Sequence, residues 1–134
     1  MKKLLSVLLF AFAIVGIAAV INISPIEQAS VEAYTYRQVE ALHILVPTEI
    51  KAQEIRKEIM AGQTQTEIFN NFRKAAKMYS KCPSGADGGM LGWFGRGDMV
   101  PEFEKAAFAL TPGEVSEPVK TQYGYHLIYI LARK

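Results

Sequence analysis

The sequence predicts an α+β domain that follows an N-terminal apolar helix. Three observations support this class. An uncharged run, residues 4–23, is followed by a polar stretch, residues 24–38, and then by a region of mixed composition, residues 39–134. Within that region, short segments rich in branched side chains alternate with segments of helical periodicity, in the order strand, two helices, strand, helix, two strands. The single cysteine allows no internal disulfide, so the domain depends on its apolar core. This order favours a small, mostly antiparallel sheet.

The N-terminal run is typical of a signal peptide or a membrane anchor. Lys2 and Lys3 precede 20 residues that carry no charge, and such flanking lysines hold the N-terminus in the cytoplasm. A length of 20 residues suffices to span a bilayer and favours the anchor slightly. A small-residue cleavage site at Val31–Ala33 keeps secretion after cleavage open. A buried core helix is disfavoured because the run is apolar on every face. Residues 24–38 are predicted to be a linker, and either route places residues 39–134 outside the cytoplasm.

The first half of the domain combines one strand with two helices. The branched segment 39–46 predicts a strand that ends at Pro47. Thr48 can then cap a helix that extends to Gly62, with Ile50, Ile55, Ile59 and Met60 at near-helical spacing. After the polar break 63–66, a second helix is expected over 67–79. Its buried stripe comprises Ile68, Phe69, Phe72, Ala75, Ala76 and Tyr79.

The second half begins with the glycine-rich loop 80–89, which contains the cysteine. A strand is predicted over 90–94 and a short helix over 100–108, with Pro101 in its first turn. The segment 111–114 has the composition of a turn. A short peripheral strand is expected over 115–119, and an apolar strand over 123–132 closes the domain.

Four polar residues lie among apolar neighbours: His43, Cys82, Thr121 and His126. A single buried histidine is more often structural than catalytic. Two on neighbouring strands, however, could bond directly or through Thr121, because strands lie about 4.8 Å apart. A thiol hydrolase would need Cys82 to be ionised by a histidine. A metal site is disfavoured because no CxxC, HxxxH or HExxH spacing is present. The net charge of +2 and the absence of basic–aromatic clusters argue against nucleic acid as a partner.

Four blocks in order, "ALHILV", "YSKCPSGADGGMLGWF", "GDMVPEFEKAAFAL" and "GEVSEPVKTQYGYHLI", resemble the parvulin family of peptidyl-prolyl cis–trans isomerases. The resemblance extends from Ala41 to the C-terminus and implies a four-stranded antiparallel sheet surrounded by helices. Residues 62–72 are longer than in compact members of the family, and Arg73 replaces a small or acidic residue. Both departures lie outside the four blocks.

The resemblance assigns roles residue by residue. His43 and His126 match the family's paired histidines, Thr121 matches the hydroxyl that joins them, and Cys82 matches a position filled by cysteine or aspartate. The pocket for the substrate's proline ring is matched by Leu91, Phe94, Met99 and Phe103. Taken alone, these four side chains could equally belong to the core. The family's tolerance of aspartate indicates that the Cys82 thiol tunes the site's electrostatics and is not a covalent nucleophile.

The implied function is isomerisation of Xaa–Pro bonds in exported, unfolded polypeptides, with no cofactor and no metal ion. No phosphate requirement is expected, because the segment 47–53 after the first strand contains no arginine for bidentate phosphate binding. The alternative is a non-catalytic holdase that binds peptides in the same apolar cleft.

Overall fold

The computed structural model describes residues 36–134. The apolar run 4–23 and residues 24–35 of the expected linker lie outside the described residues. The elements, in chain order, are β1 (Gln38–Val46), α3 (Glu49–Met60), α4 (Gln65–Tyr79), the 3-10 helix η1 (Pro83–Asp87), β2 (Met90–Gly95), α5 (Pro101–Ala109), β3 (Val119–Thr121) and β4 (Gly124–Arg133). Among the helices of this region, none has the length and apolar character needed to cross a membrane.

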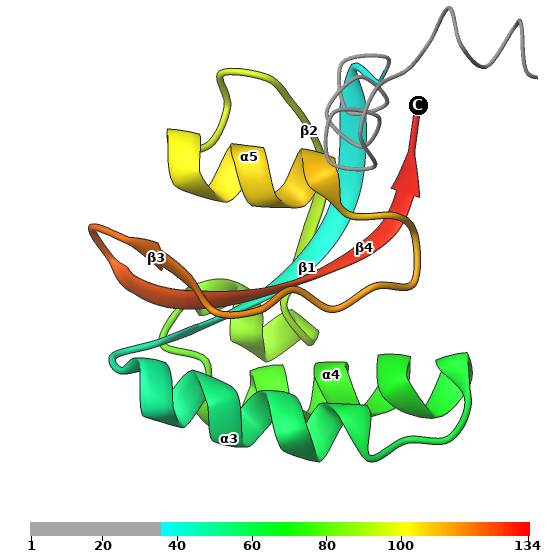
Figure 1. The fold of residues 1–134 in the computed structure, drawn as a ribbon, viewed down its shortest axis with the longest axis vertical. Coiled ribbons are helices and arrows are strands. Elements are labelled where there is room, and N and C mark those ends of the chain that lie inside the picture. Colours follow the sequence, from blue (N-terminus) through cyan, green and yellow to red (C-terminus); the bar gives the residue numbers. More distant parts are fainter. Residues whose placement is uncertain (1–35) are drawn as a thin grey trace, which may run out of the picture. The chain divides into compact units, whose positions relative to one another are not determined.

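The four strands form one sheet in the order β2-β1-β4-β3, and every neighbouring pair is antiparallel. Helix α5 covers one face of the sheet, while α3 and α4 cover the other (Figure 1). The predicted class, a four-stranded antiparallel sheet surrounded by helices, is therefore confirmed.

Alternation along β1 divides the apolar core between the two faces of the sheet. Leu42, Ile44 and Val46 belong to the cluster beneath α3 and α4. Val39 and Ala41 belong to the cluster beneath α5. Successive side chains of a strand point to opposite faces, so the next residue on the α5 face is His43. The first of the two histidines thus continues an apolar row.

Helices α3 and α4 follow the predicted pattern with three corrections. Ala52, Ile55 and Ile59 are buried, but Ile50 and Met60, which we expected in the core, are 75% and 43% exposed. Helix α4 starts at Gln65, two residues before the predicted start. Thr64 caps it by accepting from the Glu67 amide at 3.2 Å. The polar break 63–66 therefore contains the N-cap of α4, and its Gln/Thr composition did not indicate that the helix starts there.

The strand predicted over 115–119 is wrong in position. Val115 makes only an isolated bridge with Tyr129, and β3 begins at Val119. Pro118 has no amide hydrogen and interrupts the ladder. Ser116 bonds to Ile128 instead, since its hydroxyl accepts from the Ile128 amide at 2.9 Å.

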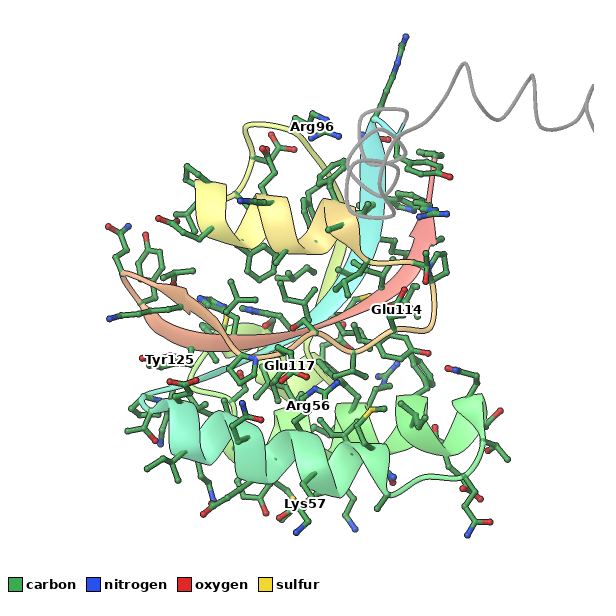
Figure 2. All side chains as sticks on the ribbon, viewed as in Figure 1. Arg56, Lys57, Arg96, Glu114, Glu117 and Tyr125 are labelled. Carbon is green, nitrogen blue, oxygen red and sulfur yellow. The ribbon has the colours of Figure 1, made fainter. Side chains whose placement is uncertain are left out.

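Arg56 ties this connection to α3. Its Nε donates to the Ser116 carbonyl oxygen at 3.0 Å, and its guanidinium lies 3.4 Å from Glu117 Oε1. Figure 2 places Arg56 between α3 and the segment that leads into β3. The contact holds the approach to β3, the strand that contains Thr121.

Candidate active site

Two histidines meet on the α5 face of the sheet. His43 pairs with Ile128 and His126 pairs with Leu45 across β1 and β4, so the two histidines are diagonal neighbours on one face. Diagonal neighbours of this kind lie within reach of aromatic side chains. Their Nδ1 atoms are 3.1 Å apart, and the planes of the two rings differ by 18°. The direct contact that the sequence left open is therefore present.

A hydroxyl group is hydrogen-bonded to each of the two outer ring nitrogens, His43 Nε2 and His126 Nε2. Ser84 Oγ lies 3.0 Å from His43 Nε2. Thr121 Oγ1 lies 2.7 Å from His126 Nε2 and also accepts a hydrogen bond from the Tyr123 amide at 3.2 Å. All four ring nitrogens are thus used in a chain that runs from Ser84 to Thr121.

The direction of this chain depends on the tautomers of the two imidazoles. In one pair of tautomers Thr121 donates to His126 Nε2, His126 donates from Nδ1 to His43 Nδ1, and His43 donates from Nε2 to Ser84 Oγ. The reverse direction satisfies the same contacts, because the Thr121 hydroxyl oxygen can accept from both the Tyr123 amide and His126 Nε2. In either direction one imidazole donates to the other.

Both histidines are neutral near pH 7. Burial, with a further contribution from the neighbouring His126, lowers the pKa of His43 from 6.5 to about 4. Burial also lowers the pKa of His126. Neutral, mutually bonded imidazoles are poorly suited to proton transfer, but they provide a fixed floor for the site.

Aromatic side chains pack against the histidine pair. The Phe103 ring is edge-on to both imidazoles, with centroids 5.6 Å from His43 and 5.2 Å from His126. The Phe94 and Phe103 ring centroids are 5.9 Å apart, and Phe94 is 4% exposed. Phe94 therefore packs against Phe103 in the core beneath α5.

A tethered loop places Cys82 beside the pair. Ser80 Oγ accepts from the amides of Leu45 and Cys82, at 3.1 and 3.3 Å, and the Lys81 amide donates to the Leu45 carbonyl at 2.8 Å. These hydrogen bonds hold the loop against the end of β1. Both nitrogens of His43 are already engaged, so neither is free to take a proton from the thiol. The geometry disfavours the thiol hydrolase.

An apolar cavity of about 470 Å³ opens above the histidines. Six of the eight residues expected in the site line it, namely His43, Cys82, Leu91, Met99, Phe103 and His126. Thr121 and Phe94 do not line it: Thr121 bonds to His126, and the Phe94 ring packs against the Phe103 ring. The other lining residues are Leu45, Lys81, Pro83, Asp98, Val100 and Tyr123.

Sequence reasoning missed Ser84 and the charged rim of the cavity. Ser84 is two residues from Cys82, and this proximity was the only available signal. Its contact with His43 depends on how η1 folds back against β1, which periodicity does not encode. In the described part of the chain, no three His, Cys, Asp or Glu side chains are grouped as metal ligands would be.

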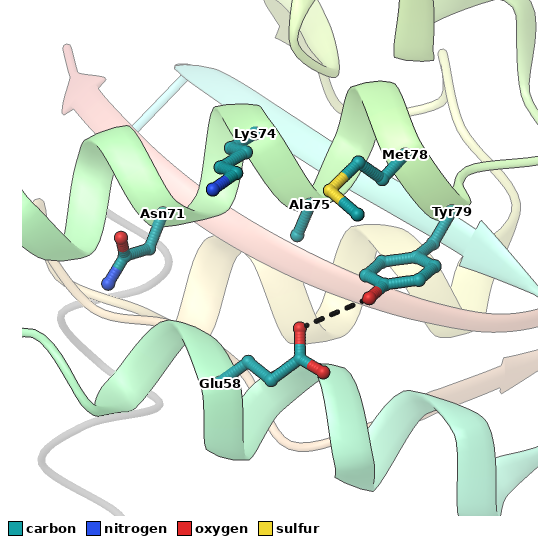
Figure 3. Close-up of a pocket in the computed structure, with 6 residues that line it drawn as sticks. All are labelled: Glu58, Asn71, Lys74, Ala75, Met78 and Tyr79. Atoms are coloured by element: carbon teal, nitrogen blue, oxygen red, sulfur yellow. Dashed lines mark hydrogen bonds between the residues drawn. The ribbon is translucent and has the colours of Figure 1, made fainter.

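A second cavity, of about 240 Å³, lies between α3 and α4. Figure 3 shows its lining, where the Tyr79 hydroxyl donates to Glu58 Oε2 at 3.4 Å. It is lined by Glu58, Asn71, Lys74, Ala75, Met78 and Tyr79. The cavity contains neither histidine nor Cys82, so the chemistry of the fold is concentrated on the α5 side.

Comparison with known proteins identifies the domain. The family described as the PPIC-type PPIase domain (rotamase) matches residues 43–132, from the first histidine to the end of β4. The chain belongs to this parvulin family. Every residue that lines the larger cavity falls within the matched segment of this parvulin domain.

Individual relatives extend the comparison. Foldase protein PrsA of Geobacillus kaustophilus is 47% identical over 116 residues, which cover 84% of this chain and 39% of that protein. Two SurA-like chaperones of Campylobacter jejuni, the virulence factor PEB4 and the periplasmic protein Cj1289, have been studied structurally. A solved structure from that pair matches this chain with a TM-score of 0.70 at 32% identity. That match covers 100% of this chain and 57% of the other. The chain thus spans well under two thirds of both proteins.

A compact relative matches almost completely. The solution structure of the parvuline of Nitrosopumilus maritimus has a TM-score of 0.61 at 38% identity, and the match covers 72% of this chain and 97% of that protein. That protein consists of little more than the matched domain. A parvulin domain of this extent therefore folds without further segments, and residues 35–134 are a suitable unit for experiments.

Proposed function

We propose that the domain catalyses cis–trans isomerisation of Xaa–Pro bonds. The observation that carries this proposal is the apolar cavity of about 470 Å³, which ends against a neutral histidine pair. Leu91, Met99 and Phe103 supply walls of the right character for a proline ring, and the thioether of Met99 can adapt to ring pucker. Phe94 packs against Phe103.

The reaction needs no bond to be made or broken. Rotation about a peptide bond costs about 18–20 kcal/mol because it disrupts amide resonance. In the twisted state the carbonyl loses conjugation and the prolyl nitrogen becomes pyramidal. A cavity that holds the ring and excludes water favours this less polar state over the planar one. Each tenfold gain in rate requires only about 1.4 kcal/mol of such preference.

The polar residues would act through position and electrostatics. Cys82 would lie beside the twisting carbonyl, where its thiol influences the local field without forming a covalent bond. His43, His126 and Thr121 would hold the floor of the cavity through their bonded chain. The lowered pKa values of the two histidines support a scaffolding role for them over acid–base catalysis.

The substrates we propose are unfolded, exported polypeptides. The names of the relatives, a foldase and SurA-like chaperones, support a role in protein folding. The uncharged run 4–23 behind Lys2 and Lys3 supports an extracytoplasmic domain. We assign 1–23 as an anchor, or as a signal peptide if it is cleaved, and the residues from 24 up to the start of β1 at Gln38 as a linker. The lining of the cavity contains no arginine, which supports substrates without phosphate.

A protease-coupled assay on residues 35–134 tests the proposal. The protease cleaves only trans Xaa–Pro peptides, so the slow phase reports isomerisation. We expect the parent domain to accelerate this phase, Met99→Ala to do so weakly, and Cys82→Asp to retain activity. Tyr79→Phe, which alters only the second cavity, serves as the matched control and should match the parent.

The alternative function is a holdase that binds unfolded chains in the same cavity. It predicts that the parent domain suppresses aggregation of an unfolded client while the slow phase of the peptide assay stays unchanged. That pair of results would reject the isomerase. Loss of activity in Cys82→Asp, in a domain that remains folded by circular dichroism, would reject the environmental role of the thiol.

A further inference from the structure

Two oppositely charged residues stand at the cavity, on two different loops. Lys81 precedes Cys82 in the loop after α4, and Asp98 precedes Met99 in the loop between β2 and α5. Most of the remaining lining is apolar or aromatic, so these two charges dominate the field that an approaching peptide meets. Opposite charges on two sides of a binding cavity are a means of selecting and orienting a substrate.

Lys81 has a fixed backbone and an uncommitted side chain. Its amide donates to the Leu45 carbonyl at 2.8 Å, which holds its Cα at the end of β1. Within residues 36–134, the Lys81 ammonium group has no hydrogen bond, ion pair or cation–π contact. The ammonium is therefore available to a ligand.

Asp98 differs from Lys81 in that its side chain is already engaged. Its Oδ2 accepts from the Gly95 amide at 2.7 Å, so the carboxylate is engaged in its own turn. It remains exposed and negative beside Met99. A substrate carboxylate is thus attracted to the Cys82 side of the cavity and repelled from the Met99 side.

The position of Lys81 relates it to one residue of the substrate, given the proposed function. With the proline ring among Leu91, Met99 and Phe103, the preceding carbonyl lies beside Cys82. The side chain of the residue before proline then comes within reach of Lys81, the neighbour of Cys82 in the chain. The geometry points to Lys81 as a specificity-determining residue that favours an acidic side chain immediately before proline and disfavours a basic one.

The size of the preference is limited because the Lys81 side chain is exposed to solvent. Exposed ion pairs contribute modestly, so the attraction of a glutamate and the repulsion of a lysine should together change kcat/KM by roughly three- to tenfold. Because both charges are in solvent, the preference should shrink as the Debye length falls from about 10 Å at 0.1 M salt to about 3 Å at 1 M.

The test compares three peptides that differ only in the residue before proline: glutamate, glutamine and lysine. Values of kcat/KM are measured with residues 35–134 and with Lys81→Glu, at low and high salt. We expect the order glutamate, glutamine, lysine for the parent and the reverse order for Lys81→Glu. Lys77→Glu is the matched control, because Lys77 is exposed on α4, does not line the cavity and gives the same change in net charge.

The outcomes separate this inference from the proposed function. Turnover of all three peptides at equal rates, or an unchanged order in Lys81→Glu, overturns the role of Lys81 and leaves the isomerase intact. The glutamine peptide is neutral, so its turnover reports the activity itself, and no acceleration of any peptide rejects the proposed function. A reversed order in Lys77→Glu would also overturn the inference, since net charge would then explain the preference.

Discussion

The buried histidine pair predicts that mild acid destabilises the domain. His43 and His126 are the two histidines of the chain, and burial lowers the pKa of both. As the pH falls, the unfolded chain, with a histidine pKa near 6.5, takes up protons before the folded domain does. The histidine contribution to stability is therefore fully present above about pH 6.5. It is lost progressively as the pH falls toward the folded pKa of His43, about 4.

The magnitude follows from the pKa of His43. Between pH 6.5 and 5 the unfolded chain gains a proton that the folded domain does not, and each pH unit costs about 1.4 kcal/mol. We expect His43 alone to lower the free energy of unfolding by about 2 kcal/mol between pH 7 and 5. His126 acts in the same direction.

Urea unfolding of residues 35–134 at several pH values between 7.5 and 5 measures this loss. His43→Asn is the control, because it removes one titrating ring and should flatten the profile. Imidazole resonances followed by NMR supply an independent check: in the folded domain the His43 ring should titrate only near pH 4, and the His126 ring should titrate below its ordinary value of 6.5. A free energy of unfolding that stays constant over this range, or rises with acid, would refute the burial argument.

Three further predictions concern packing. Gly89→Ala should lower the free energy of unfolding by more than about 1 kcal/mol, because its φ is +87° and a Cβ would lie 2.5 Å from the His43 carbonyl oxygen; parent-like stability would contradict this. Arg56→Ala should cost about 1 kcal/mol in urea unfolding through its lost hydrogen bond, whereas equal effects from the exposed Lys57→Ala would show that the bond contributes nothing. Ile50→Ala should change the melting temperature little, since Ile50 is 75% exposed; a large fall would mean that α3 packs differently.

Much of the fold was predictable because local patterns and long-range packing agree. The branched run 39–46 forms β1, and the apolar stripe of α4, from Ile68 to Tyr79, faces the core as its periodicity predicts. The failures have local causes. Ile50 has the spacing of a core residue but lies in the first turn of α3, beyond the edge of the cluster. Pro118 displaced the third strand, because its missing amide hydrogen outweighs the branched residues before it.

The site was predictable only in part. The residues on regular strands and at the start of α5 could be placed, since strand alternation and helix start signals fix their directions. Ser84 lies in the short 3-10 helix η1, and Lys81 and Asp98 lie in loops. Tertiary hydrogen bonds such as those of Ser80 set how these segments fold over the sheet. Phe94 was placed correctly on its strand, but no sequence pattern indicates that it packs against Phe103 without lining the cavity.

Exchange spectroscopy by NMR on an unmodified peptide with one Xaa–Pro bond tests the central claim most directly. It detects cis–trans exchange itself, without a protease, while the peptide is in excess over residues 35–134. The account predicts exchange cross-peaks between the cis and trans resonances that appear only when the domain is present. Resonances that broaden through binding, with no exchange cross-peaks, would show that the cavity holds proline without turning its bond and would contradict the account.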